Sequence, residues 1–298
     1  MARRKQELEE ELKSFELKSF ELKNRPEIEE KKGISNKIFN LLILVLIFIM
    51  IYSFFQLYQT NADYSDGKEE YQKLEEEVVE QIPEQMKTIE KEKKDGIRKN
   101  AGETPAKENK LTAPISVDFK TLKQKNSQIL AWIYIEALDI SYPVVQGKDN
   151  DYYLHRTIEG NYNFAGSIFM DWENSNDFKD CNTVIYGHNM ADGSMFGKLK
   201  KMTLEGAYDK SPYVWILTED NNYRYEIFSA QVVTVANECY TLFAQPDDNY
   251  LSFLERMSLN SGIQTEKKDF NIDNRVLTLS TCTGDGTNQD RYVVQAVR

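Results

Sequence analysis

Apolar residues follow three different patterns along this chain of 298 residues. Residues 38–58 are almost continuously apolar, and a helix of about 20 such residues is long enough to cross the hydrocarbon core of a membrane. Residues 59–112 are rich in Glu and Lys and favour helix, with Pro83 breaking the run. From residue 113 onward, short apolar runs alternate with Gly, Asn and Asp. The pattern predicts a transmembrane anchor, a helical charged stalk and a β-rich domain, in that order.

The flanks of the apolar run predict how the chain is oriented. Residues 1–37 are dominated by Glu and Lys, and we expect them to form a solvated charged tail. Lys31, Lys32 and Lys37 precede the run, whereas acidic residues follow it. Under the positive-inside rule, the N-terminus stays cytoplasmic and the domain at 113–298 lies outside the cell. The run is longer than the roughly 7–15 apolar residues of a signal peptide, so we expect an uncleaved anchor in the cell membrane.

Eight short runs in the C-terminal region have the composition of β-strands. They are Ile129–Ile135, Ile140–Val145, Gly166–Asp171, Thr183–His188, Tyr213–Leu217, Tyr223–Val235, Val276–Cys282 and Tyr292–Val297. Eight strands joined by turn residues indicate a mainly β domain, built as a closed barrel or a sandwich.

Two segments of this region have helical character instead. Met195–Met202 predicts a short helix. Asn249–Leu259 predicts another helix, inserted between the sixth and seventh strands. The residues that we expect on its apolar face are Leu251, Leu254 and Met257.

Net charge and cysteine content narrow the possible partners. The formal net charge of −11 argues against nucleic acid, which is bound by basic surfaces. Three cysteines cannot all pair within the chain, so no dense disulfide framework is expected. We expect Cys181 and Cys239 to be packed thiols, and the sequence leaves open whether they pair with each other.

The third cysteine, Cys282, ends an apolar strand, and a second strand begins at about Arg291 after the turn-rich GDGTNQD. Pairing as an antiparallel hairpin would make these two residues neighbours. A guanidinium beside a thiol favours the thiolate and can hold a developing oxyanion. His188 ends another apolar strand. Each residue alone also fits a structural role, but together they supply a nucleophile, an oxyanion donor and a general acid/base.

The motifs around these residues resemble those of the sortase family. TLSTC ends at Cys282, Arg291 follows shortly, and YGHNM contains His188. WIYIEALDISYPVVQGKDNDYYL, AGSIFMD and the helix before the seventh strand resemble class B sortases in particular. The similarity covers about residues 113–298. It implies an eight-stranded sortase-type β-barrel, whose groove binds a C-terminal sorting peptide of the LPxTG or NPxTN kind.

The resemblance also implies roles for individual residues. Cys282 would attack the Thr carbonyl of the sorting motif, Arg291 would stabilise the oxyanion, and His188 would protonate the departing amine. An amine of the cell wall would then resolve the thioacyl enzyme, which makes surface proteins and peptidoglycan the expected partners. The residues implied to contact the substrate are Ser280, Asn150 and Leu154. No metal or cofactor is expected, because a class B enzyme gives no reason to expect the calcium site of class A.

The sequence leaves three alternatives open: a cysteine peptidase that only hydrolyses its thioacyl intermediate, a sortase that polymerises pilus subunits, and a non-enzymatic barrel that binds peptides. Asp285 and Asp290 lie in the loop from which an acidic residue could orient His188, although the mechanism requires none. The other histidine, His155, lies in a polar stretch, and we expect its replacement by alanine to be nearly silent.

Overall fold

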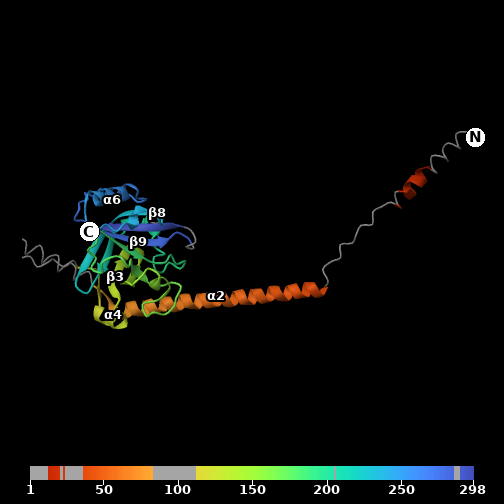
Figure 1. The fold of residues 1–298 in the computed structure, drawn as a ribbon. Coiled ribbons are helices and arrows are strands. Elements are labelled where there is room, and N and C mark those ends of the chain that lie inside the picture. Colours follow the sequence, from red (N-terminus) through yellow and green to blue (C-terminus); the bar gives the residue numbers. More distant parts are fainter. Residues whose placement is uncertain (1–12, 21–22, 24–35, 83–111, 205, 285–288) are drawn as a thin grey trace, which may run out of the picture. The chain divides into compact units, whose positions relative to one another are not determined.

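The computed structural model describes residues 13–20, 23, 36–82, 112–204, 206–284 and 289–298 (Figure 1). Contacts within the chain define two compact units, Met1–Leu57 and Tyr58–Arg298. The predicted division into a tail, an anchor, a stalk and a catalytic domain stays a prediction. The second unit, however, includes the first part of the predicted stalk together with the β-rich domain.

The first unit contains the N-terminal part of the long helix α2 (Asn36–Val78). Residues Asn36–Gln56 of this helix form a stretch of 21 residues with a mean hydropathy of 2.7. None of this stretch is buried within the protein. By length and composition it is a candidate membrane span, and it overlaps the predicted anchor at 38–58.

The C-terminal part of α2 packs against the β-rich domain. Tyr71, Leu74 and Val78 are spaced along one helical face and are buried in the main hydrophobic core. The Tyr71 hydroxyl donates a hydrogen bond to the carbonyl of Gly166 at 2.9 Å. This part of the predicted stalk is therefore built into the barrel's own core.

Helix α2 ends earlier than the sequence analysis predicted. Strand β1 (Val79–Gln81) follows it directly and pairs antiparallel with β2 (Ile115–Val117). The prediction of helix up to Pro83 is wrong, because backbone pairing to β2 competes successfully with helical propensity. The second predicted stalk helix lies in residues 83–111, outside the described residues.

The second unit is built on a closed eight-stranded β-barrel (Figure 1). The strands are β3 (Ile129–Ile135), β4 (Ile140–Val145), β5 (Ile168–Met170), β6 (Asn182–Tyr186), β7 (Tyr213–Leu217), β8 (Asn222–Thr234), β9 (Val276–Cys282) and β10 (Asp290–Val297). They close in the order β10-β8-β7-β3-β4-β5-β6-β9. The predicted mainly β fold with eight barrel strands is confirmed. At one point of the barrel, β9 lies between β6, which is parallel to it, and β10, which is antiparallel.

Short helices connect the strands. They are α4 (Phe119–Lys125), η1 (Glu136–Leu138), η2 (Tyr152–His155), α5 (Lys201–Leu204), η3 (Ala207–Asp209) and η4 (Glu238–Tyr240). The cap of α4 shows how local sequence sets such an element: the Asp118 carboxylate accepts the backbone N–H groups of Lys120 at 3.0 Å and Thr121 at 3.1 Å.

The prediction of a helix at Met195–Met202 is largely wrong. Only the end of this segment is α-helical, where it enters α5. Met195 has a positive φ of 50° and forms a β-bridge with Asn189. The backbone of Gly197 approaches the Met190 carbonyl so closely that a Cβ would clash with it. The segment therefore folds back as a tight loop before α5 begins.

Helix α6 (Asp248–Leu259) lies between β8 and β9 in the chain, as predicted (Figure 1). Its buried residues are Tyr250, Phe253, Leu254 and Met257. They form a cluster with Val276 of β9 and Val293 of β10, so β9 is buried on both of its faces. The polar residues of β9, which are Thr278, Ser280 and Thr281, are therefore buried together with its apolar ones. Leu251, which was expected on the apolar face of α6, is only half-buried.

Replacing Leu74 with alanine tests whether the end of α2 belongs to the core. The Leu74 side chain is 4% exposed, so the variant should lower the free energy of unfolding by about 2–5 kcal/mol. Leu259 at the end of α6 is 84% exposed, and Leu259→Ala should change the free energy of unfolding by less than about 0.5 kcal/mol. Urea unfolding of the full chain in detergent micelles, followed by near-UV circular dichroism, measures both. Equal stabilities of the two variants would contradict the packing described for α2.

Candidate active site

Cys282 and Arg291 are direct neighbours in the sheet. Cys282 is the last residue of β9, and its partner in the antiparallel register of β10 is Arg291. Residues directly opposite each other in an antiparallel pair place their Cβ atoms about 4.5–5.5 Å apart and their side chains on the same face. Both side chains are partly exposed. The strand pairing therefore places Arg291 directly opposite a partly exposed cysteine at one end of the barrel.

His188 is brought to the same place by the parallel pairing of β6 and β9. The last pair in their register is Tyr186 with Ser280, and both His188 and Cys282 lie two residues further along. The Gly187 N–H donates to the Ser280 carbonyl at 3.2 Å on one side of this position. The Asn189 side-chain amide donates to the Gly284 carbonyl at 3.3 Å on the other side. His188 is thus aligned with Cys282 between two tethers.

The imidazole of His188 is fixed at its edge and on its face. Its Nε2 lies 2.8 Å from the carbonyl oxygen of Leu154. A carbonyl can only accept, so Nε2 carries the proton, and Nδ1 is the free acceptor of the neutral ring. The rings of His155 and Phe164 stack on His188, with centroid distances of 5.3 Å and 5.7 Å.

Burial is the largest influence on the pKa of His188 and lowers it. The hydrogen bond to Leu154 opposes this effect, whereas repulsion from His155 adds to it. At Nε2 the partner of His188 is the Leu154 carbonyl and not one of the acidic residues that the sequence analysis considered. Asp290 is exposed at the start of β10, and Asp285 lies outside the described residues.

The three cysteines are all free thiols, so Cys181 and Cys239 do not pair with each other. Both are buried, and burial raises the pKa of each; that of Cys239 rises to about 12. A thiol with so high a pKa is a poor nucleophile at neutral pH. Cys282 is the least buried of the three.

Comparison with known proteins identifies the family to which this chain belongs. Residues 133–298 match the sortase domain. Sortase B of Listeria monocytogenes is 37% identical over 183 residues, which cover 60% of this chain and 72% of that protein. The chain belongs to the sortase family. Crystal structures agree: sortase B from B. anthracis is 40% identical, with a TM-score of 0.54 over 60% of this chain and 82% of that one. A Staphylococcus aureus sortase B–substrate complex is 30% identical, with a TM-score of 0.56 over 60% and 83%.

This sortase is a cysteine transpeptidase of class B, as the motif resemblance implied. The residues implied to contact its substrate are held by hydrogen bonds in the structure. The hydroxyl of Ser280, which is 2% exposed, lies 2.8 Å from that of Tyr240. Asn150 donates to the Asp171 carboxylate at 3.0 Å and accepts the backbone N–H of Trp172 at 3.0 Å. The roles of Ser280, Asn150 and Leu154 in substrate binding stay predictions.

Tyr240 is a site residue of the sortase that the sequence analysis missed. It ends η4, and its ring stacks on Tyr186 with a centroid distance of 6.4 Å. Burial raises the pKa of its hydroxyl to about 12; the bond to Ser280 lowers the pKa, as does attraction to Arg291, whereas Cys282 raises it. Tyr240 thus lies within electrostatic reach of the proposed nucleophile and of its arginine. Its sequence context, a polar loop after Cys239, carries no motif that would have revealed it.

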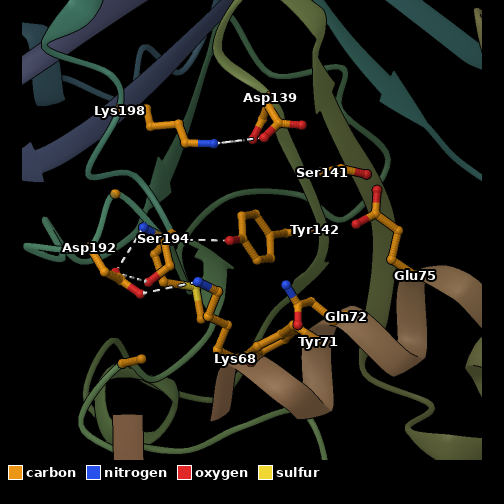
Figure 2. Close-up of a pocket in the computed structure, with 13 residues that line it drawn as sticks. Lys68, Tyr71, Gln72, Glu75, Asp139, Ser141, Tyr142, Asp192, Ser194 and Lys198 are labelled. Carbon is orange, nitrogen blue, oxygen red and sulfur yellow. Dashed lines mark hydrogen bonds and ion pairs between the residues drawn. The ribbon is translucent and has the colours of Figure 1, made fainter. Parts of the chain in front are cut away.

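The loop that carries His188 is braced from the barrel and from α2, around a pocket of about 240 Å³ (Figure 2). The Tyr142 hydroxyl of β4 accepts the backbone N–H of Met195 at 3.2 Å. The Lys198 ammonium binds the Asp139 carboxylate at 2.8 Å. Lys68 of α2 lies 4.0 Å from the Asp192 carboxylate. These contacts hold the return path of the loop, whose Phe196 N–H bonds the His188 carbonyl at 3.0 Å.

No group of three or more His, Cys, Asp or Glu side chains is placed to hold a metal ion in the part of the chain that the structure describes.

Proposed function

We propose that this sortase cleaves a C-terminal LPxTG- or NPxTN-like sorting motif after Thr, through a thioacyl on Cys282, and transfers the protein to a cell-wall amine. His188 acts as general acid/base and Arg291 as the oxyanion partner. The observation that carries this proposal is the pairing of β9 with two strands. Its pairing with β10 places Cys282 opposite Arg291, and its pairing with β6 aligns Cys282 with His188. The S. aureus relative was solved as a complex with its substrate, which supports a substrate-binding site in this family member.

The first half-reaction forms the thioacyl enzyme. The Cys282 thiolate attacks the Thr carbonyl carbon, and the carbonyl electrons move onto oxygen, where Arg291 balances the charge. The tetrahedral intermediate collapses and the C–N bond after Thr breaks. His188 delivers a proton to the departing amine, so the C-terminal peptide leaves as a neutral amine.

The second half-reaction transfers the protein. A cell-wall amine attacks the thioacyl carbon, and His188 accepts a proton from the attacking nitrogen. The C–S bond breaks and Cys282 returns as the thiolate, which restores the starting state. The same imidazole nitrogen therefore gives and takes one proton in each cycle, and no oxidant or cofactor is consumed.

The environment of His188 predicts a slow first step. An ordinary histidine is roughly one quarter protonated at pH 7. Burial lowers the pKa of His188, so a smaller fraction carries the proton that the leaving amine needs. A tethered enzyme acting on a tethered substrate tolerates slow turnover, because the shared membrane surface raises their effective concentration.

The proposed location follows from the N-terminal part of the chain. We propose that residues 38–58 anchor the protein in the cell membrane with the N-terminus cytoplasmic and the barrel outside. The apolar stretch Asn36–Gln56 and the lysines that precede it support this topology. Surface proteins with sorting signals and the peptidoglycan amine are then the partners, at the surface of a Gram-positive-type cell.

A product assay tests the proposal. The full chain in detergent micelles is incubated with LPxTG- and NPxTN-type peptides, with and without triglycine as an amine. We expect a covalent adduct on Cys282 by mass spectrometry and, when triglycine is present, a peptide ligated to it after Thr. Cleavage that yields only the free acid, whether or not the amine is present, would instead indicate a hydrolase. No adduct with any peptide of the panel would reject the proposal.

A further inference from the structure

Two consecutive residues of η2 hold the acid/base histidine from two directions. The Leu154 carbonyl accepts the Nε2–H of His188 at 2.8 Å. The next residue, His155, stacks its ring on the same imidazole, with the two planes 24° apart. The sequence analysis placed His155 in a polar stretch without a role, whereas the fold places it directly against the site.

His155 is one of three rings that contact one another. His155 and Phe164 stack at 5.9 Å and 29°, and Phe164 stacks on His188 at 22°. Such offset pairs contribute about 0.5–1.5 kcal/mol each beyond the area that they bury. The contacts restrict rotation of the His188 ring about its χ2 angle, which would break its bond to Leu154.

The ring of His155 is itself well supported. Its backbone carbonyl accepts the N–H of Asn163 at 3.1 Å. The neighbouring Tyr153 is buried and donates to Gln128 at 2.6 Å. Nδ1 of His155 is buried, and the described structure shows no hydrogen-bond partner for it. A phenylalanine would avoid the cost of that buried nitrogen, so packing alone does not account for a histidine here.

We propose that His155 is a positioning residue for His188: its ring holds the imidazole in the Nε2–H tautomer, so that Nδ1 exchanges the proton with the substrate amine. This inference rests on the function proposed above and adds to it a second histidine.

The elements around His188 carry several titratable or charged groups. His155 comes from η2, Cys282 from the end of β9 and Arg291 from β10. Asp192, which lies in the same loop as His188, accepts a hydrogen bond from the Ser194 hydroxyl at 2.7 Å. Of these groups, His155 is the one whose charge lowers the pKa of His188. Removing that charge should therefore raise the pKa of His188.

Two substitutions separate stacking from charge. His155→Ala removes both, and we expect thioacyl formation at saturating sorting peptide to slow about 10-fold, with the KM changed less than twofold. His155→Phe keeps a stacking ring without charge, and we expect a rate within about threefold of the unmodified chain. Leu259→Ala, which removes an exposed side chain at the end of α6, is the control and should keep the normal rate.

A spectroscopic measurement tests the same inference independently of activity. The chain has only two histidines, so ¹⁵N-histidine labelling of protein without a histidine tag gives two sets of ring signals, and the His155 variants retain one. We expect His188 to be a single Nε2–H tautomer in the unmodified chain and in His155→Phe, and a mixture in His155→Ala. The titration midpoint of His188 should be higher in His155→Phe than in the unmodified chain.

Specific results would overturn this role. A His155→Ala rate within twofold of normal, a His155→Phe rate as low as that of His155→Ala, or an unchanged tautomer in His155→Ala would each contradict it. If His155→Ala does not fold, the rate and titration of His155→Phe still decide. An unmodified chain that forms no adduct on Cys282 rejects the proposed function, whereas normal adduct formation with unaffected variants rejects only the role of His155.

Discussion

Replacing Cys282 with alanine is expected to abolish thioacyl formation, lowering peptide cleavage by at least about three orders of magnitude. The reason is that alanine leaves Arg291 and His188 in place but removes the atom that forms the covalent bond. Because Cys282 is partly exposed at the end of β9, its truncation should cost little stability. Mass spectrometry of the full chain with sorting peptides, together with cleavage rates, measures the effect.

The other two thiols provide matched controls for Cys282→Ala. Cys239→Ala and Cys181→Ala remove thiols that are buried in the cluster beneath α6. We expect both variants to form the adduct at near-normal rates, with some loss of thermal stability because each leaves a small cavity. An adduct that persists in Cys282→Ala and disappears in Cys239→Ala would make Cys239 of η4 the nucleophile and refute the assignment of Cys282.

The strands that the sequence predicted best are those bounded by clear turn residues. The bounds of β3, β4, β7 and β9 coincide with the predicted runs, because each is a short stretch rich in apolar and β-branched residues that is followed by polar or turn-forming ones. The run at 166–171 was predicted too long, since Gly166 has a positive φ of 57° and belongs to the preceding turn. Local composition therefore located the strands, and backbone geometry at their ends decided their length.

Two segments could not be predicted from local pattern because distant contacts determine them. The end of α2 contributes Tyr71 and Leu74 to the barrel core, and only the folded barrel provides the apolar surface that they cover. The loop at 195–200 has helix-compatible composition, but the bond from the Met195 N–H to Tyr142 and the bridge to Asn189 impose a different path. In both cases tertiary packing overrides a weak local preference.

The sequence predicted some parts of the site better than others. The placement of Cys282 beside Arg291 follows from a hairpin, which is local in sequence. The alignment of His188 with Cys282 follows from a parallel pairing of strands that lie far apart in the chain. The sequence suggested it only through the position of each residue at a strand end and through motif resemblance. The support from Leu154 and His155 was not predictable, because a backbone carbonyl and a ring stack leave no residue signature at a fixed spacing.

Replacing Arg291 with lysine is expected to lower the rate of thioacyl formation about 10²–10³-fold, although the positive charge is kept. A planar guanidinium offers several donors at fixed angles, whereas an ammonium on a flexible stem is a point charge that must be ordered at each turnover. In this chain one of those donors is already committed, because Nη1 of Arg291 bonds the carbonyl of Asp290 at 2.9 Å. That bond orients the guanidinium on its strand, and a lysine at this position would lack the fork that makes it.

The KM for the sorting peptide should change little in Arg291→Lys, because the oxyanion exists only in the transition state and not in the bound substrate. Arg224→Lys is the control: Arg224 lies on β8 with its guanidinium 4.5 Å from the centre of the Tyr213 ring, and its replacement should leave the rate within about twofold. Stopped-flow measurement of amine release at saturating peptide gives both rates, and thermal unfolding verifies that both variants fold. If Arg291→Lys works at nearly the normal rate while folding normally, stabilisation of the oxyanion does not depend on Arg291. The pairing of Arg291 with Cys282 would then serve the fold of the hairpin rather than its chemistry.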